Sequence, residues 1–305
     1  MAETSSKRSL FRILALGGVV VLLVGAICYL MAARQVTLNP PADGSDSPLA
    51  IGLGVVGLIL VCIGAIAAIA GGFGLVVVSG RPIGLLSLLL IPVGVALDFA
   101  LAALNTALKL PLFLDSVGHI LAGMLGGPVI GGVTGFLGVL TNATFQPAAI
   151  VWCFQGATIG VVVGLLAQAS MFKGIKRIII SGLIVIATSA TLSSVISLVV
   201  YGGIDGYTIS FIRAALTKMG WSMSSAVVTT SVVIELIDKT ISVGLPCLVI
   251  AGMSNRLLNQ FVTGPKLRDM KVEAVSDTTS VQELADAAAG AADGYGSYGD
   301  DASVK

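Results

Sequence analysis

Apolar segments about as long as a bilayer is thick follow one another through most of this 305-residue chain. Hydrophobic residues make up 56% of the sequence and charged residues 11%, whereas soluble domains carry about 25% charge. A segment inside a bilayer must satisfy its backbone hydrogen bonds internally, as an α-helix does. We therefore predict an all-α, polytopic membrane protein that forms a helical bundle, and the composition excludes a soluble enzyme.

The breaks between the apolar segments predict a core of six helices within residues 81–261. These helices cover residues 82–108, 113–126, 128–140, 147–168, 178–201 and 221–258. Residues 202–220 mix polar and apolar side chains and are predicted to form a loop with an amphipathic helix. The third core helix carries Gly131 and Gly135, and small residues four apart let helices approach closely.

Additional segments are predicted at both ends of the core. A short cytosolic head, residues 1–10, precedes two extra transmembrane helices in residues 11–80, namely 11–32 and 48–80. Residues 262–305 are rich in acids, alanine and glycine, and are predicted to be a disordered cytosolic tail. With eight segments, most lysines and arginines outside the helices fall on the same side of the membrane as both termini. Because such residues are enriched on the cytosolic side, we expect both termini in the cytosol and the chain in the cell (plasma) membrane.

Catalytic and metal-binding motifs are absent from the sequence. It contains no Gly-x-x-x-x-Gly-Lys-Ser/Thr motif for nucleotide phosphates and no His-Glu-x-x-His zinc motif. The four cysteines lie in apolar segments without the spacing of a metal site. We therefore expect no enzymatic activity, no cofactor, no metal and no binding of nucleic acid.

Three motifs in a fixed order resemble the substrate-binding (S) components of energy-coupling factor (ECF) vitamin transporters. The first is LP-x-x-LDS-x-G at 110–118, followed by GP-x-x-G at 127–131. The second is TNAT-x-x-P at 141–147, and the third is IELIDKTIS at 234–242. The resemblance covers about residues 81–261, and it rests on the order and spacing of the motifs together.

The resemblance implies a membrane subunit that captures a small micronutrient, such as a vitamin or nucleobase, from outside the cell. Its implied partners are a transmembrane coupling subunit and two ATPase subunits, which would drive uptake. It also places substrate at the outer loops, around residues 109–112, 141–147 and 202–220. The alternatives are a membrane-embedded sensor or assembly module and a self-sufficient secondary transporter, although the sequence contains no convincing internal repeat of the kind such transporters use.

Asp115 and His119 are the first candidates for substrate binding. They are four residues apart, so they share one face of a helix and could recognise a polar ligand together. An acid and a histidine inside an apolar segment indicate a cavity lined by protein. The alternatives are that Asp115 caps the short helix starting near Ser116 and that His119, oriented by Asp115, only packs.

Further candidates follow the second motif. Asn142, Thr144 and Gln146 are uncharged polar residues in a predicted outer loop, where such residues are also common without a role. Trp152 and Gln155 lie one turn apart near the start of the next helix. Trp152 could stack on a flat ring, or it could anchor the helix at the membrane interface.

The last core helix contains Glu235, Asp238 and Lys239, which share one face. Charged groups inside an apolar helix must face protein or water, so these three either bind substrate or hold neighbouring helices by an ion pair. Glu235 and Lys239 are expected to pair, with Asp98 as a further partner.

Small residues on the first core helix are candidates for contact with a partner subunit. The resemblance implies that an Ala-x-x-x-Ala spacing there packs against the transmembrane coupling subunit. Two pairs have this spacing: Ala96 with Ala100, and Ala103 with Ala107. Ordinary packing within the bundle is the alternative, because alanine is abundant in this chain.

Overall fold

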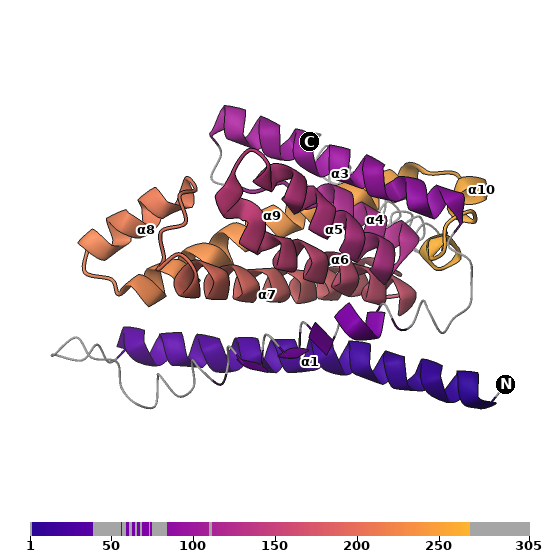
Figure 1. Cartoon of the computed structure of the whole chain (residues 1–305), viewed down its shortest axis with the longest axis horizontal. Helices are drawn as coiled ribbons and strands as arrows, with labels where there is room; N and C mark the ends of the chain where they lie inside the picture. Colours follow the sequence, from indigo (N-terminus) through magenta and orange to yellow (C-terminus); the bar gives the residue numbers. More distant parts are fainter. Residues whose placement is uncertain are drawn as a thin grey trace, which may run out of the picture.

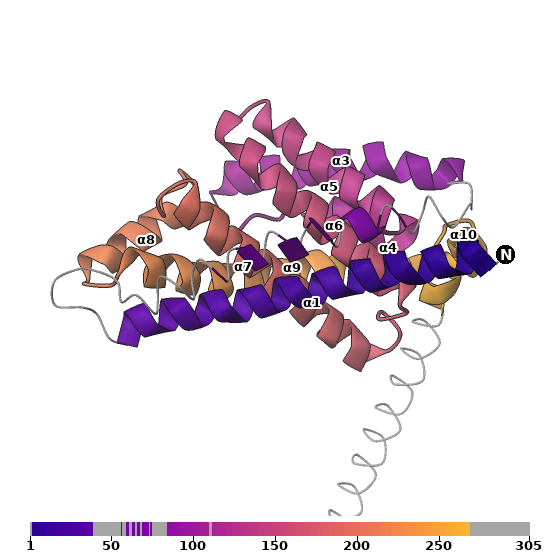
Figure 2. The ribbon, with the colours of Figure 1, turned by 60° about the horizontal axis from the view of Figure 1, so that its bottom comes forward.

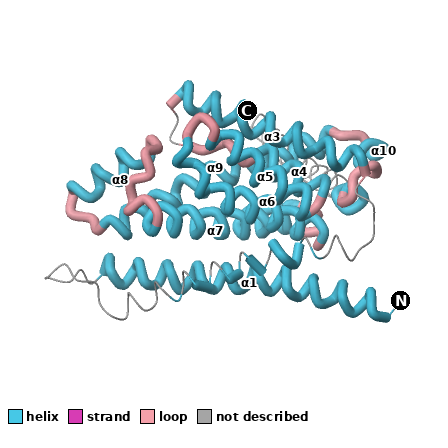
Figure 3. Tube along the Cα trace, in the orientation of Figure 1, coloured by secondary structure: helices cyan, strands magenta, loops and turns pink. Residues whose placement is uncertain are grey.

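The computed structural model describes residues 2–38, 84–109 and 112–268, together with scattered positions between 56 and 74. All regular elements in these residues are helices (Figures 1 and 3), which confirms the all-α prediction. The helices are α1 (Ala2–Leu38), α3 (Leu85–Leu108), α4 (Val117–Gly126), α5 (Pro128–Ala143), η1 (Pro147–Trp152), α6 (Cys153–Gln168), α7 (Ile175–Val199), α8 (Ile209–Lys218), α9 (Met223–Gly252) and α10 (Asn255–Leu258). The predicted helix 48–80 lies largely outside the described residues.

Three of the described helical stretches are long and apolar enough to cross a membrane. They are Leu85–Leu108, Pro147–Gln168 and Ile175–Val199. α4 is much shorter, with ten residues, and it is buried along nearly its whole length. Ten helical residues span about 15 Å, far less than the roughly 30 Å apolar core of a bilayer, so α4 is an internal helix of the bundle.

α4 and α5 form a tight hairpin in the middle of the bundle. Gly127 joins them with φ of 85°, a left-handed backbone conformation that suits glycine, and Pro128 then begins α5. α5 packs against α6 through glycines on both helices. A Cβ atom at Gly160 would overlap the carbonyl oxygen of Gly131, and one at Gly135 would overlap that of Gly156. The glycines therefore permit backbone contact, as the sequence predicted.

α1 lies along one side of the bundle, against α6, α7 and α9 (Figures 1 and 2). Its buried residue Ala15 faces that side and clusters with Val161 and Leu165 of α6. The helix already begins at Ala2, so residues 2–10 continue α1 where a separate head was predicted. The N-terminus and α10 lie at one end of the bundle, and α8 lies at the other (Figure 1).

Two boundary predictions differ from the structure. The predicted helix 221–258 is interrupted after Gly252, and Ser254 then caps the short α10 by accepting a hydrogen bond from the Leu257 amide. The predicted disordered tail was wrong at its start, because residues 264–268 are helical and Leu267 is buried. Thr263 fixes this segment by donating hydrogen bonds to carbonyl oxygens at the end of α4. The rest of the predicted tail lies outside the described residues.

The contact between α5 and α6 generates a stability prediction. We expect Gly160→Ala to destabilise the protein by about 1–3 kcal/mol, because the added methyl group must push two backbones apart. Gly182→Ala is the matched control, since a Cβ there meets no atom within 4 Å. Alanine is also the better helix former, so Gly182→Ala should be neutral or slightly stabilising. Thermal unfolding of both purified variants measures the difference, and equal melting temperatures would contradict the prediction.

Candidate functional site

A cavity of about 960 Å³ lies where α3, α4, α5, α6 and α9 meet the loops before α4 and α8. Its size falls in the range of about 300–1,000 Å³ that small-molecule sites occupy. Alanine and aromatic side chains form part of its wall, and acids, amides, hydroxyl groups, one histidine and two lysines also line it. This composition, apolar with a few converging polar groups, is typical of a binding site for a small molecule.

Asp98 of α3 and His119 of α4 form a buried pair beside the cavity. The Asp98 carboxylate accepts from the backbone amides of Gly118 and His119, at 2.6 and 3.2 Å, and lies 2.9 Å from His119 Nδ1. Asp98 therefore caps the start of α4 and orients the imidazole. Its other nitrogen, Nε2, is buried and has no hydrogen-bond partner, and His119 lines the cavity.

This arrangement bears on two alternatives that the sequence left open. One was that Asp115 caps α4 and orients His119, and the other was that Asp98 is a further partner of the charged residues of α9. Asp98 instead reaches α4 because Gly94 and Gly118 bring α3 and α4 into backbone contact, where a Cβ at Gly118 would overlap the Gly94 carbonyl oxygen. Only the tertiary contact shows which acid pairs with the histidine.

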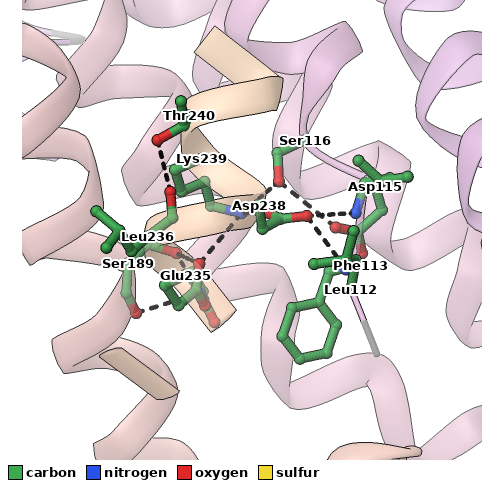
Figure 4. A network of polar contacts seen from close by, with 12 residues as sticks. Leu112, Phe113, Asp115, Ser116, Ser189, Glu235, Leu236, Asp238, Lys239 and Thr240 are labelled. Carbon is green, nitrogen blue, oxygen red and sulfur yellow. Dashed lines mark hydrogen bonds and ion pairs between the residues drawn. The ribbon is translucent and has the colours of Figure 1, made fainter. Parts of the chain in front are cut away.

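Lys239 of α9 is the centre of a second buried group, shown in Figure 4. Its ammonium donates to Asp238 Oδ2 and to Ser116 Oγ, both at 2.6 Å, and lies 3.4 Å from Glu235 Oε2. The predicted Glu235–Lys239 pair is therefore confirmed, and the adjacent Asp238 is the closer partner. All four side chains are almost fully buried. The two acids need the Lys239 cation there, because a buried carboxylate without a counter-ion is strongly destabilising.

Asp238 also holds the loop before α4 in place. Its Oδ1 atom accepts from the backbone amides of Phe113 and Leu114, at 3.1 and 2.7 Å. Leu114 has φ of 49°, a left-handed conformation that costs about 1–2 kcal/mol for a residue with a side chain. The carboxylate thus stabilises an unfavourable turn that delivers Asp115 and Ser116 to the cavity.

Glu235 connects α9 to two further helices. It accepts from Ser189 Oγ of α7 at 2.6 Å and from Gln155 Nε2 of α6 at 3.3 Å. Gln155 Nε2 also donates to Ser189 Oγ at 2.9 Å, which leaves its Oε1 atom buried without a partner. Gln155 as a whole is 7% exposed and lines the cavity.

Asp115 is the one cavity carboxylate without a close cation among the described residues. Its only described hydrogen bond is a long one, 3.5 Å, from Ser116 Oγ. Burial raises the pKa of Asp115 to about 7; the positive charge of Lys239 opposes this shift, and the negative charge of Asp238 adds to it. Asp115 can therefore change charge near neutral pH.

Aromatic rings form the wall nearest to α8. Trp152 stacks on Tyr201, with ring centroids 6.1 Å apart and planes 8° apart, and meets Tyr207 edge-on at 6.3 Å. Phe113 meets the other side of Tyr207 edge-on at 5.9 Å. Trp152, Tyr207 and Phe113 all line the cavity.

A buried ion pair that the sequence analysis did not identify holds the loop carrying Tyr207. Arg213 of α8 donates to Asp205 Oδ2 at 2.7 Å, and both side chains are 1% exposed. Arg213 also donates to Thr230 and Ser231 of α9, which attaches α8 and the loop to the bundle. The sequence does show an aspartate and an arginine eight residues apart near a predicted helix start, which could have indicated an ion pair. It does not show that the pair is buried, because the burial depends on contact with α9.

The structure brings most of the predicted binding residues together. Those that line the cavity are Asp115, His119, Asn142, Gln146, Trp152, Gln155, Glu235 and Lys239. Thr144 and Asp238 are not part of the lining: Thr144 is exposed and donates to the Thr141 carbonyl oxygen, while Asp238 supports the loop from behind. The sequence analysis did not identify Asn105, Phe113, Ser116 or Tyr207, which also line the cavity.

The four alanines of α3 predicted to contact a partner subunit are all exposed, on one face of the helix. Ala103 and Ala107 line the cavity, whereas Ala96 and Ala100 lie outside it. In the part of the chain that the structure describes, no group of three His, Cys, Asp or Glu residues is arranged to hold a metal ion.

Fold and site together define a helical protein with membrane-length helices and a polar cavity where the bundle meets its loops. No protein-family model, curated protein or solved structure matches this chain. The resemblance to S components therefore enters below as a proposal.

The Lys239 group generates a second stability prediction. Lys239→Met should destabilise the protein by about 3–5 kcal/mol, because it leaves Glu235 and Asp238 buried without a cation. Adding Glu235→Gln should recover part of this loss by removing one unpaired charge. Chemical unfolding of the purified variants measures both effects. Lys218→Met, at an exposed position, is the control and should change stability by less than about 0.5 kcal/mol. A double variant no more stable than Lys239→Met would contradict the role of Lys239 as counter-ion.

Proposed function

We propose that this chain is the membrane-embedded substrate-binding subunit of an ECF-type importer. In this proposal a six-helix core captures a small micronutrient from outside the cell, and partner subunits drive its uptake with ATP. The observation that carries the proposal is the cavity, because His119 and Gln155 line it and each has a buried polar atom without a hydrogen-bond partner among the described residues. Buried polar groups are almost always paired, so unpaired ones in a cavity support a missing ligand.

The residues that line the cavity support ligand binding rather than catalysis. The lining comes from α3, α4, α5, η1, α6, α7, α8 and α9 and from the loops before α4, η1 and α8, so a ligand there would contact most of the bundle at once. The polar lining groups either support one another, as Glu235 and Lys239 do, or offer a single free atom. Ser116 Oγ lies 2.6 Å from Lys239 Nζ, but this ammonium is held between Asp238 and Glu235 as their counter-ion, so it is not positioned as a base that activates a nucleophile.

The outer surface of α3 supports contact with a coupling subunit. Only Ser87, Gly94 and Asp98 of this helix are buried, so most of its surface is free to meet lipid or protein. Ala96 and Ala100 are exposed on it, and small residues four apart favour close helix packing. In the proposal this alanine surface receives the transmembrane coupling subunit, which in turn contacts two ATPase subunits.

Ligand binding is tested by purifying the protein and identifying any bound small molecule by mass spectrometry. Asp115→Asn, Gln155→Ala and Trp152→Ala should each weaken its binding by about tenfold to a hundredfold, because each removes a buried contact worth about 1.5–3 kcal/mol. Calorimetry on folded variants measures these affinities. Thr144→Ala is the control, since Thr144 belongs to the same region but does not line the cavity. Unchanged affinity in all three variants would contradict binding in this cavity.

Coupling is tested by uptake in cells that contain ATPase and coupling subunits. Ala96→Trp and Ala100→Trp should block uptake but leave substrate binding unchanged, because the bulky rings hold the helix of the coupling subunit away from α3. Leu88→Trp is the control, an exposed α3 position outside the alanine face. Loss of binding in the alanine variants would place this face in the site instead. Uptake that persists without ATPase subunits would favour a secondary transporter.

A further inference from the structure

The buried polar atoms that remain free in the cavity are mostly hydrogen-bond acceptors. His119 Nε2, Gln155 Oε1 and Asn105 Oδ1 are buried and have no partner, and all three residues line the cavity. The nitrogen of each group already contacts the protein: His119 Nδ1 contacts Asp98, Gln155 Nε2 donates to Ser189, and Asn105 Nδ2 donates to the Leu112 carbonyl oxygen at 2.5 Å. The Trp152 indole N–H is a buried donor beside them.

Lys239 is already engaged by groups of the protein. Its ammonium donates to Asp238 and Ser116 and lies 3.4 Å from the Glu235 carboxylate. Asp115 therefore faces the cavity as a carboxylate that no described cation contacts. The carboxylate is a fourth acceptor, and it is the strongest of the set when ionised.

The buried charges around the cavity do not balance. Carboxylates come from the buried Asp98, Glu235 and Asp238 and from the half-buried Asp115. Among the described residues, the only buried cationic groups beside them are Lys239 and, when protonated, His119. Lys109 lines only the exposed rim. The buried part thus carries a net negative charge in either state of His119, which favours a positive ligand.

The aromatic wall favours the same kind of ligand. Trp152, Tyr207 and Phe113 line the cavity beside Asp115, and aromatic faces attract cations within about 6 Å of the ring. A flat compound can lie against these rings while its N–H groups reach Asp115, His119 and Gln155.

We infer that the cavity takes a flat, cationic, nitrogen-containing compound that donates several N–H hydrogen bonds, with Asp115 as its counter-ion. This inference rests on the proposed function, because it names the class of substrate that the same cavity would bind. Neutral acceptor-rich compounds and anions are excluded by the acceptors and negative charge of the site.

The titration of Asp115 adds a pH dependence. The groups that face it are Asp98 of α3, His119 of α4, Lys239, Asp238 and Glu235 of α9, and Tyr207 of the loop before α8. With a pKa of about 7, the carboxyl group is largely neutral below that pH and largely ionised above it. Cation affinity should therefore rise as pH increases through about 7 and level off above it.

The test compares three compounds of nearly the same shape: benzamidine, which is cationic and rich in N–H donors, neutral benzamide and anionic benzoate. Trp221→Phe leaves Trp152 as the only tryptophan, so its fluorescence reports binding to the full-length protein in nanodiscs. Benzamidine should bind about tenfold or more tightly than benzamide, and benzoate should bind most weakly. Benzamidine stays cationic between about pH 6 and pH 8, so its rising affinity over this range reports a group of the protein.

Asp115→Asn is the decisive variant. It should keep the melting temperature within a few degrees, reduce the preference for benzamidine over benzamide to about threefold or less, and abolish the pH dependence. Asp115→Glu, which keeps the charge, should retain the preference. Benzamide or benzoate binding as tightly as benzamidine would overturn the inference while leaving a ligand-binding cavity in place. No effect of any of the three at millimolar concentration would also overturn it, and co-purification would then decide the proposed function separately.

Discussion

The ammonium of Lys239 makes the arrangement around the cavity possible. It neutralises Asp238 and Glu235, and these two acids in turn organise the surrounding elements. Asp238 holds the turn before α4 through two backbone amides, and Glu235 contacts Ser189 of α7 and Gln155 of α6. Without this cation the acids would be buried unpaired, which costs several kcal/mol, and three helices and one loop would lose their common point of attachment.

Close helix contact is the second requirement. Glycines between α3 and α4, and between α5 and α6, remove the side chains that would separate these backbones. The contact of Gly94 with Gly118 places Asp98 over the amide end of α4, so a packing feature also decides the orientation of His119. Packing and polar chemistry are thus not separate in this bundle, because the short buried α4 depends on both.

The site combines groups that are already satisfied with atoms that are not. The pairs Asp98–His119, Glu235–Lys239 and Asp205–Arg213 stabilise walls and loops, whereas Asp115, His119 and Gln155 line the cavity with polar atoms that have no close partner among the described residues. This division is expected of a preorganised binding site, where supporting contacts fix the few groups that meet the ligand. It supports ligand capture better than a purely structural role for the buried charges.

The sequence by itself determined the all-helical class, because long apolar segments with little charge have no other stable form in a bilayer. It also indicated the Glu235–Lys239 pair, since residues four apart share a helix face. Which acid meets His119, the burial of Arg213 with Asp205, and the exclusion of Thr144 and Asp238 from the cavity lining were decided only by the tertiary structure. Each of these depends on how two helices distant in sequence approach each other, and helical periodicity carries no information about that approach.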